Sequence, residues 1–240
     1  MKYTQRGKLR MDGTRYSRQL DAQLFSLEDQ VKLQGASVVV CGCGGLGSPA
    51  ATYLAAVGVG TLHLFDQDRV TESNLNRQTL YATSDIGQRK ALVARERLVQ
   101  LNSEISIVAH PIDITQGEQF IHTLETADVV VDCLDNPTTR GFVSRAAVDA
   151  GLPLVHGGIH AWQGQIAVFL PEERPTLEDM LAHASPQAPP PVIGAVAGLI
   201  GSLQALEVIK LILGKPSLDT SRMHVYDGLE SAWLSYPKSG

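Results

Sequence analysis

The sequence predicts an α/β fold built on a doubly wound, mostly parallel sheet, and three observations support this prediction. Short apolar runs rich in β-branched residues alternate with helical segments through the middle of the chain, which is the pattern of parallel strands joined by crossover helices. The first of these runs breaks into a glycine-rich turn at residues 42–47. Two later runs, 163–170 and 223–236, alternate like strands outside this rhythm, which indicates a non-parallel C-terminal extension of the sheet.

The alternating part of the chain divides into five strands and four helices. Each strand is a short β-rich run bounded by turn signals, and we expect them at residues 36–41, 61–65, 105–109, 129–133 and 153–156. The helical segments between them are each long enough for a right-handed crossover, and we expect them at residues 48–57, 87–101, 117–124 and 139–150.

The flanking segments complete the predicted organisation. A chain of 240 residues with 44% hydrophobic residues can bury one full core, so we expect a single domain over residues 1–240. Residues 14–35 predict two short helices, which belong to an N-terminal helical arm over residues 1–34. Residues 171–191 are rich in proline and charge, and they predict a mobile crossing loop with at most one helical turn near 177–183.

One segment, residues 192–214, is close to the length that a membrane-spanning helix needs,. Gln204, Glu207 and Lys210 lie three residues apart and form one polar stripe along it. Glycines in its first half give it a small-residue face for close helix packing. We therefore expect a buried amphipathic helix and no membrane partner.

Charge and cysteine content limit the classes of function. The formal net charge is -5 at pH 7, which argues against a nucleic-acid partner, because phosphate backbones are bound by clustered Lys and Arg. We expect a small molecule or a protein as the partner. The three cysteines form no disulfide framework and no basic-then-apolar leader opens the chain, so we expect a reduced, cytoplasmic setting.

The glycine-rich turn indicates a phosphate-binding site. Gly42, Gly44 and Gly47 fit G-x-G-x-x-G between a strand and a helix, the Rossmann-like turn whose backbone N–H groups and helix start bind phosphate. Asp66 and Asp68 end the second strand, where a carboxylate can accept both ribose hydroxyls. The pattern fits NAD as well as ATP, and the alternative without a ligand is a tight structural turn.

The stretch from residue 69 to residue 91 favours a triphosphate. Asn74, Asn76, Arg77 and Lys90 follow the ribose acids closely. A triphosphate carries about four negative charges, which need fixed cations and usually Mg²⁺, whereas the turn itself largely satisfies a dinucleotide. The alternative for Lys90 and its neighbours is a solvated helix end.

A second acidic segment ends the fourth predicted strand. Asp132 and Asp135 flank the point where this strand stops, and the carboxyl ends of parallel strands line the ligand crevice. Asp135 could hold Mg²⁺ on the phosphates. Asp132 could cap the following turn, because Asn136-Pro137 is itself a turn signal, so one of the two acids can be purely structural.

The remaining titratable side chains carry weaker signals. His156 and His160 lie near a strand that borders the crevice and His183 lies in the crossing loop. Without a third metal-type ligand nearby, we expect core or rim histidines.

The three thiols lie at the same end of the predicted sheet. We expect Cys41 and Cys133 to pack as small apolar residues. Cys43 follows the first glycine of the turn, where a helix N-terminus can lower a thiol pKa. We expect no catalytic role for Cys41 or Cys43.

Taken together and in order, these motifs resemble the MoeB/ThiF/HesA adenylyltransferase family, the bacterial relatives of ubiquitin-activating enzymes. The resemblance extends from about Arg15 to Tyr226. It rests on the following stretches: RYSRQ (15–19), the glycine turn, DQD (66–68), SNLNRQ (73–78), the Lys90 helix, DCLDN (132–136), GQI (164–166) and IGSLQALEVIK (200–210).

The resemblance implies an activity and a set of site residues. Relatives use ATP and Mg²⁺ to adenylate the C-terminal Gly-Gly carboxylate of a small ubiquitin-like sulfur-carrier protein, releasing pyrophosphate. By matching motif positions, Arg18, Arg77, Lys90 and Asp135 would be catalytic, with Asp135 as the Mg²⁺ ligand. The implied nucleotide-binding residues are Gly42, Gly44, Gly45, Gly47, Asp66, Asp68, Ser73, Asn74, Arg77, Lys90, Asp135 and Asn136.

The resemblance also implies partners. Arg18 would reach from one subunit of a homodimer into the site of its neighbour, and Trp162 could contact the carrier's tail.

Relatives commonly carry two C-x-x-C pairs that bind zinc, and thioester-forming relatives carry a cysteine in the crossing loop. Residues 171–180, 185–194 and 235–240 contain no cysteine. We therefore expect no zinc site, and an enzyme that stops at the acyl-adenylate and receives sulfur from sulfide or a separate sulfurtransferase.

Two other classes of function remain open from the sequence. An NAD-dependent oxidoreductase would use the same glycine turn and strand-end acid, but a recognisable acid or base for hydride transfer is missing. A non-catalytic scaffold would keep the adenylation fold for dimerisation or carrier binding, and the missing zinc and thiol residues fit it.

Overall fold

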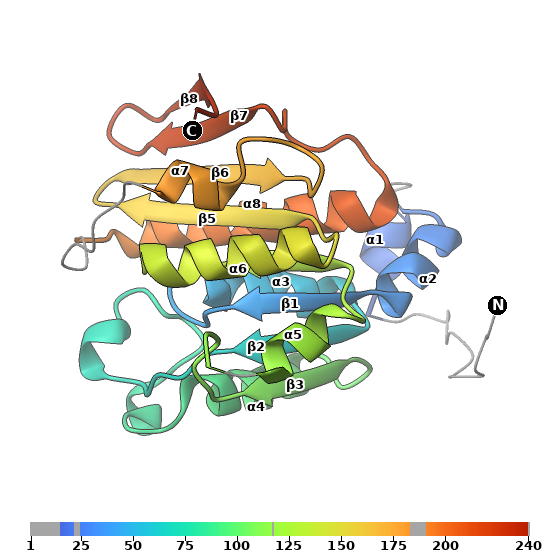
Figure 1. The fold of residues 1–240 in the computed structure, drawn as a ribbon. Helices are drawn as coiled ribbons and strands as arrows, with labels where there is room; N and C mark the ends of the chain where they lie inside the picture. Colours follow the sequence, from blue (N-terminus) through green and yellow to red (C-terminus); the bar gives the residue numbers. More distant parts are fainter. Residues whose placement is uncertain (1–14, 22–24, 117, 183–190, 240) are drawn as a thin grey trace.

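The computed structural model describes residues 15–21, 25–116, 118–182 and 191–239, and its described part contains one eight-stranded sheet (Figure 1). The strand order is β3-β2-β1-β4-β5-β6-β7-β8. Strands β1 to β5 pair in parallel and β5 to β8 pair antiparallel. The strands are β1 (Ser37–Cys41), β2 (Thr61–Phe65), β3 (Ser106–His110), β4 (Val129–Asp132), β5 (Leu154–His160), β6 (Gln163–Phe169), β7 (Arg222–Asp227) and β8 (Ala232–Pro237). The predicted fold class is confirmed.

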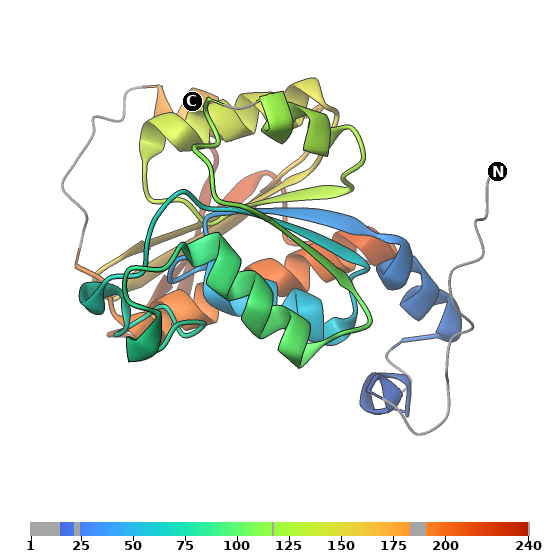
Figure 2. The same ribbon diagram turned by 90° about the horizontal axis from the view of Figure 1, so that it is seen from below.

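Helices cover both faces of the sheet (Figure 2). On one face, α3, α4 and α8 build an apolar cluster around Leu54, Leu98 and Ile200. On the other face, α5, α6 and α7 build a second cluster around Phe120 and Val143. The helices are α1 (Ser17–Asp21), α2 (Leu27–Gly35), α3 (Gly47–Val57), α4 (Lys90–Leu101), α5 (Glu118–Leu124), α6 (Pro137–Asp149), α7 (Leu177–Leu181) and α8 (Gly194–Leu213), with 3₁₀ turns η1 (Glu72–Asn74) and η2 (Thr83–Asp85).

The structure moves several predicted boundaries, each for a local reason. Strand β5 continues to His160 because its second half pairs residue by residue with β6. Helix α4 begins at Lys90, three residues later than predicted, because Gly87 has a φ of +87° and its N–H donates to Val70 in a turn. The predicted run 223–236 is two strands, β7 and β8, joined by a tight turn in which Asp227 accepts backbone N–H groups.

Helix α8 is the segment that the sequence compares with a membrane span. By length and composition it could cross a membrane, and half of its most apolar window is buried inside the protein. The predicted polar stripe points into the protein, where Gln204 donates to two backbone carbonyls and Glu207 accepts from Lys210, Ser217 and the Leu218 N–H. Because the polar groups on this face are paired inside the protein, α8 is a core helix packed on β4, β5 and β6, as expected.

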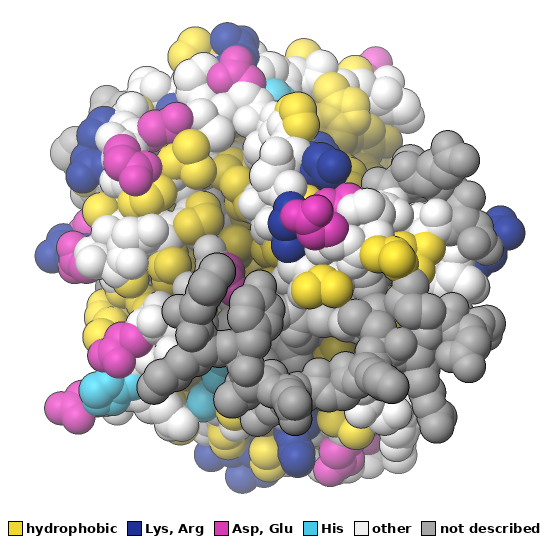
Figure 3. All heavy atoms as spheres, turned by 90° about the vertical axis from the view of Figure 1, so that its right-hand side faces the viewer, with side chains coloured by type: hydrophobic (Ala, Val, Ile, Leu, Met, Phe, Trp, Pro, Cys, Tyr) yellow, Lys and Arg dark blue, Asp and Glu magenta, His cyan; other side chains and the backbone are white. Residues whose placement is uncertain are grey.

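The edge of the molecule that carries α1 and α2 presents a mixed surface (Figure 3). Lys and Arg side chains on this face stand beside Asp and Glu side chains, with hydrophobic groups between them. Lys32 pairs with Glu28, and Lys215 lies 3.8 Å from Asp29. These two pairs bring opposite charges together among the described residues of this face.

A histidine pair in the sheet makes the stability of the fold depend on pH. Burial and the neighbouring His63 lower the pKa of His110 from 6.5 to about 4. Below pH 6.5 the unfolded chain binds a proton that folded His110 does not, so stability falls as the pH drops from 6.5 toward 4. His110→Phe keeps the ring stacked on Phe65 and removes this titration. Between pH 7 and pH 5, the free energy of unfolding measured in urea should fall by about 1 kcal/mol less for the variant than for the wild type, after allowance for solvent screening.

The control for this prediction is His122→Gln, because His122 is an exposed histidine that lies beside Glu125 on the surface. Its stability should follow the wild-type pH dependence. Equal pH slopes for the wild type and His110→Phe would contradict the assignment.

Candidate functional site

The glycine turn joins β1 to α3 and is shaped by close backbone approaches. Gly42 has a φ of +92°, and a Cβ on it would lie 2.8 Å from the carbonyl oxygen of Cys133. A Cβ on Gly47 would overlap the carbonyl oxygen of Gly42. The turn therefore requires glycine at both positions before any ligand is considered, and it lies against the end of β4.

The other two glycines face the segment that follows η1. A Cβ on Gly45 would lie 3.3 Å from the Ala197 Cβ and 3.5 Å from the Arg77 Cγ, and one on Gly44 would lie 3.5 Å from the Gln78 Nε2. Helix α3 starts after Leu46 without a side-chain N-cap. The Ser48 N–H donates to the Gly44 carbonyl and Pro49 has no N–H. A ligand would therefore use the N–H groups of the turn itself, where the positive end of the α3 dipole favours an anion.

Asp66 ties the end of β2 to the glycine turn. Its Oδ2 accepts from the Cys43 N–H at 2.8 Å and its Oδ1 accepts from the Asp68 N–H at 2.8 Å. Burial raises the pKa of Asp66, although Lys90 and the two N–H groups oppose this effect. Each carboxylate oxygen retains a second lone pair, so a hydroxyl donor can still be accepted.

Lys90 is a buried cation beside these acids. Its residue is 5% exposed, and its Nζ lies 3.0 Å from Oδ2 of the largely exposed Asp68. Lys90 begins α4. In the turns before it, the backbone N–H of Tyr81 donates to the Gln78 carbonyl and that of Asp85 donates to the Ala82 carbonyl. An ammonium group held in this way, with one ion-pair partner among the described residues, is available to an anionic ligand.

The predicted stretch 73–77 lies between the glycine turn and the start of α8. Arg77 Nη1 donates to the Ser73 carbonyl and to Asn76 Oδ1, each at 2.9 Å. The Oδ1 of Asn74 accepts from the Thr71 N–H at 3.1 Å, which closes η1. The side-chain oxygen of Asn74 is therefore used by the protein, and its NH₂ group is the part that can meet a ligand.

The sequence-based site list omitted two residues next to this turn. Gln78 is 4% exposed, its Oε1 has no partner among the described residues, and its amide lies beside Gly44. The hydroxyl of Tyr81 donates to the Cys43 carbonyl at 2.8 Å. Gln78 ends the SNLNRQ stretch, which is the only sequence signal that pointed to it.

The two acids at the end of β4, Asp132 and Asp135, lie in different environments, one buried and one exposed. Asp132 is fully buried and accepts from the Leu134 N–H at 3.0 Å. Asn136 caps α6 by accepting from the Thr138 N–H at 2.8 Å. Asp135 is exposed between them, and the neighbouring Leu134 reaches the glycine turn at Gly42. Asp135 is therefore the acid that can take an external cation.

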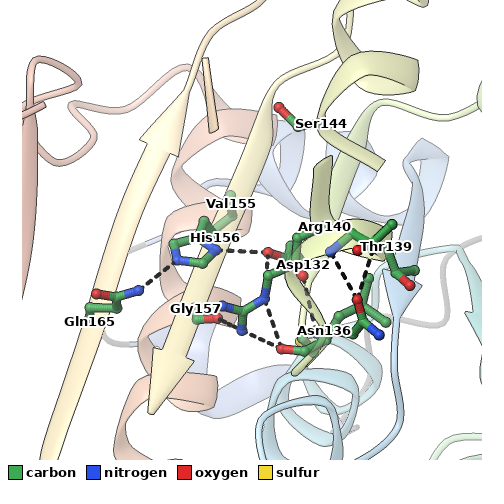
Figure 4. A network of polar contacts seen from close by, with 12 residues as sticks. Asp132, Asn136, Thr139, Arg140, Ser144, Val155, His156, Gly157 and Gln165 are labelled. Atoms are coloured by element: carbon green, nitrogen blue, oxygen red, sulfur yellow. Dashed lines mark hydrogen bonds and ion pairs between the residues drawn. The ribbon is translucent and has the colours of Figure 1, made fainter. Parts of the chain in front are cut away.

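Asp132 belongs to a buried polar network with His156, Gln165 and Arg140 (Figure 4). Its Oδ2 lies 2.7 Å from His156 Nδ1 and 3.6 Å from Arg140 Nε. Burial would raise the pKa of Asp132, but Arg140 and the hydrogen bonds from His156 and Leu134 outweigh it and hold the pKa below its usual value.

His156 is a satisfied core histidine, as predicted. Burial lowers its pKa, with Arg140 acting in the same direction, although the hydrogen bond to Asp132 opposes this. The neutral ring then donates from Nδ1 to Asp132 and accepts at Nε2 from Gln165, 3.1 Å away,. His160 and Trp162 are exposed at the end of β5, and His183 lies outside the described residues.

Arg18 is not brought to this site within its own chain. It is exposed on α1, and the adjacent Gln19 donates to the carbonyl of Val57 at the last residue of α3. The glycine turn lies at the other end of this 11-residue helix, about 16 Å away along its axis. Figure 1 shows α1 at the edge of the sheet opposite the arrowhead of β1.

The three thiols are buried and free. Burial raises the pKa of Cys41, Cys43 and Cys133 well above the usual value. The sequence left open that the start of α3 lowers the pKa of Cys43, and the structure gives the opposite direction, because this side chain lies in the apolar cluster under the turn.

Among the described residues, no three His, Cys, Asp or Glu side chains come together as a metal site. A divalent cation bound near Asp135 would therefore need further ligands from outside the protein, and phosphate oxygens are of the right type.

Comparison with known proteins gives consistent matches. The sequence profile of the ThiF family matches residues 16–239. A sulfur carrier protein adenylyltransferase of Thermus thermophilus is 41% identical over 91% of this chain and 84% of its own length. The sulfur carrier protein ThiS adenylyltransferase of Escherichia coli K12 is 40% identical over 93% and 90%. The adenylyltransferase and sulfurtransferase MOCS3 of Aedes aegypti is 39% identical, and the chain spans 51% of its length.

Solved structures agree with the sequence matches. The crystal structure of E. coli MccB with ATP has a TM-score of 0.82 at 26% identity, over 95% of this chain and 72% of that one. PaaA, at a TM-score of 0.80 and 19% identity, shares the fold.

Proposed function

The chain belongs to the ThiF family, and on that premise we propose that it is an ATP-dependent adenylyltransferase. Its second substrate is the C-terminal Gly-Gly carboxylate of a small ubiquitin-like sulfur-carrier protein, which becomes an acyl-adenylate as pyrophosphate leaves. The observation that carries the proposal is that the glycine turn contacts Arg77 at Gly45 and Leu134, the neighbour of Asp135, at Gly42. Asp66, which accepts from the Cys43 N–H of the same turn, lies close to Lys90.

The residues at this edge fit ATP by their donors and charges. The uncapped start of α3 and the side chains of Lys90 and Arg77 suit phosphate oxygens,. The lone pairs left on Asp66 suit the ribose hydroxyls. The Oε1 of Gln78, buried without a partner among the described residues beside Gly44, suits a donor on the bound nucleotide or on a water that comes with it.

The proposed reaction needs cations more than it needs a base. A carboxylate is already ionised at neutral pH. It attacks the α-phosphorus of ATP, the new bond joins carboxylate oxygen to phosphorus, and the bond to pyrophosphate breaks. Charge develops on the phosphoryl oxygens, where Lys90 and Arg77 stabilise it. Mg²⁺, which Asp135 would hold with the phosphates, supplies charge neutralisation on the leaving pyrophosphate.

Carrier-dependent ATP–pyrophosphate exchange tests this function directly. Radiolabelled pyrophosphate should enter ATP only when a carrier ending in Gly-Gly is present. A carrier lacking its last glycine is the matched control and should give none. Silence with every carrier tried would overturn the proposal, and binding of NADH without binding of ATP would favour the oxidoreductase.

We further propose that catalysis stops at the acyl-adenylate and that sulfide or a separate sulfurtransferase supplies sulfur. The support is chemical, because all three thiols are buried with raised pKa values and the thiolate is the reactive form. Buried, unpaired cysteines also fit a cytoplasmic location.

The native enzyme treated with iodoacetamide should therefore keep its exchange rate within about twofold, since the reagent attacks accessible thiolates. Incubation with carrier and ATP should form no conjugate that dithiothreitol releases. The measurement is a non-reducing gel read beside mass spectrometry of the intact chain. A reducible conjugate between enzyme and carrier would contradict the proposal.

We also propose a homodimer in which Arg18 completes the neighbouring subunit's site, because Arg18 lies at the far end of α3 from the glycine turn of its own chain. Arg18→Ala and Asp135→Asn should each be inactive. Mixed dimers would contain one complete site in two, so an equimolar mixture after subunit exchange should recover about a quarter of wild-type exchange. Arg15→Ala mixed with Asp135→Asn is the control for an exposed α1-side arginine. No recovery in the Arg18 mixture would contradict the arrangement.

A further inference from the structure

Arg140 connects the segment that follows β4 to the middle of β5. It lies on α6, and its side chain is 12% exposed. Its Nε donates to the Leu134 carbonyl at 3.0 Å, a bond that its Nη2 reinforces, and its Nη2 donates to the Gly157 carbonyl at 2.9 Å (Figure 4). The two carbonyls belong to the segment after β4 and to β5. The chemistry proposed above leaves this cation without a role.

The bond to Leu134 matters because of the next residue in the chain. The Leu134 N–H donates to Asp132 Oδ1 and its carbonyl accepts from Arg140. On the other side of Asp135, Asn136 caps α6. Leu134 is therefore fixed to Asp132 and Arg140, and Asn136 is fixed to the backbone at the start of α6. These two anchors limit the direction in which the exposed Asp135 side chain leaves the backbone.

We propose that Arg140, supported by Asp132, is a positioning residue that holds Asp135 in place to bind the divalent cation of the nucleotide. The inference rests on the proposed function, and it assigns Arg140 no contact with substrate. Asp132 offsets the charge of Arg140, and neutral His156 and Gln165 close the far side of the carboxylate. Arg140 reaches both the Leu134 and the Gly157 carbonyls, whereas the Gln204 amide joins β4 to β5 one step earlier, at Asp132 and Val155.

The planar guanidinium is what makes this residue specific. Its fork donates in two directions at a fixed angle, whereas a lysine ammonium is a point charge on a flexible stem. Arg140→Lys keeps the charge opposite Asp132 but cannot hold both carbonyls in the same geometry. The loop would then loosen while the fold and the buried charge pair remain.

The test is Mn²⁺ binding, measured by electron paramagnetic resonance in the presence of a non-hydrolysable ATP analogue. Arg140→Lys should weaken Mn²⁺ binding by about tenfold, the size typical of losing a support behind a metal ligand. Its affinity for the same analogue in EDTA should equal that of the wild type. Arg145→Lys is the matched control: it lies on the same helix and pairs with Glu178 on the surface, so both affinities should stay unchanged.

The outcomes separate this inference from the proposed function. Asp135→Asn should weaken Mn²⁺ binding at least as much as Arg140→Lys. Wild-type Mn²⁺ binding in Arg140→Lys alongside weak binding in Asp135→Asn would overturn the positioning role and leave the function standing. Equal loss of metal-free analogue binding in Arg140→Lys would also overturn it, because a general structural role predicts that result. If Arg140→Lys does not fold, Arg140→Gln is tested in its place, with the affinity for Mn²⁺ and the affinity for the metal-free analogue as the two measurements.

Discussion

Replacing Arg77 with alanine should reduce carrier-dependent ATP–pyrophosphate exchange by at least about 100-fold, the usual effect of removing one group that stabilises transition-state charge. The aliphatic stem of Arg77 lies beside Gly45 of the glycine turn, and in the described residues its guanidinium donates only to Ser73 and Asn76. These two hydrogen bonds are local, and their loss should cost about 1–2 kcal/mol of stability. The fold should therefore remain while the chemical step slows.

The measurement is the exchange rate at saturating ATP and carrier, with circular dichroism to confirm folding. Arg95→Ala is the control, because Arg95 is an arginine on α4 whose guanidinium donates to the Ile107 carbonyl, away from the glycine turn. It should exchange at the wild-type rate. If Arg77→Ala also kept exchange within about threefold of the wild type, the phosphate site would have to be placed elsewhere.

The sequence predicts the sheet well because both of its periodic signals are strong. Runs such as Val38–Cys41 are apolar on both faces, as a central parallel strand must be, and the structure buries all four residues,. Boundaries were less certain where tertiary contacts decide them. Strand β5 runs past the predicted His156 because β6 is there to pair with it, and no local pattern reports a partner strand.

The placement of Asp66 beside the glycine turn could also be predicted, because both follow strand ends. Parallel strands place their carboxyl ends together, and in the structure Asp66 accepts from the Cys43 N–H of the turn. Contacts made through burial could not be read in the same way. Gln78 and Arg140 are polar residues in polar stretches, and only the structure shows that each is enclosed.

The difference at Cys43 has the same origin. A helix start lowers a thiol pKa only when the sulfur faces the N–H groups or solvent. In the structure the Cys43 backbone N–H serves Asp66 and its side chain points into the core. Desolvation then dominates and raises the thiol pKa,. The backbone of the turn and the side chains on it therefore serve different purposes.

Replacing Gly47 with alanine should be the most destabilising single change in the glycine turn. A Cβ at this position would overlap the carbonyl oxygen of Gly42 and approach the Cys133 Cβ to 3.5 Å. The obstacle is backbone, which cannot move without opening the turn and shifting the start of α3. Such overlaps cost more than about 4 kcal/mol, and the melting temperature should fall by roughly 8 °C or more for a chain of this size.

Gly198→Ala is the matched control for this prediction, because it is the same substitution at a helical glycine. A Cβ there meets nothing within 4 Å, and alanine suits a helix interior better than glycine by about 0.5–1 kcal/mol. The two variants should therefore shift the melting temperature in opposite directions. Similar melting temperatures for Gly47→Ala and the wild type would mean that the turn can open without cost. Glycine at position 47 would then be required by the ligand and not by the packing of the backbone, contrary to what the contact with the Gly42 carbonyl indicates.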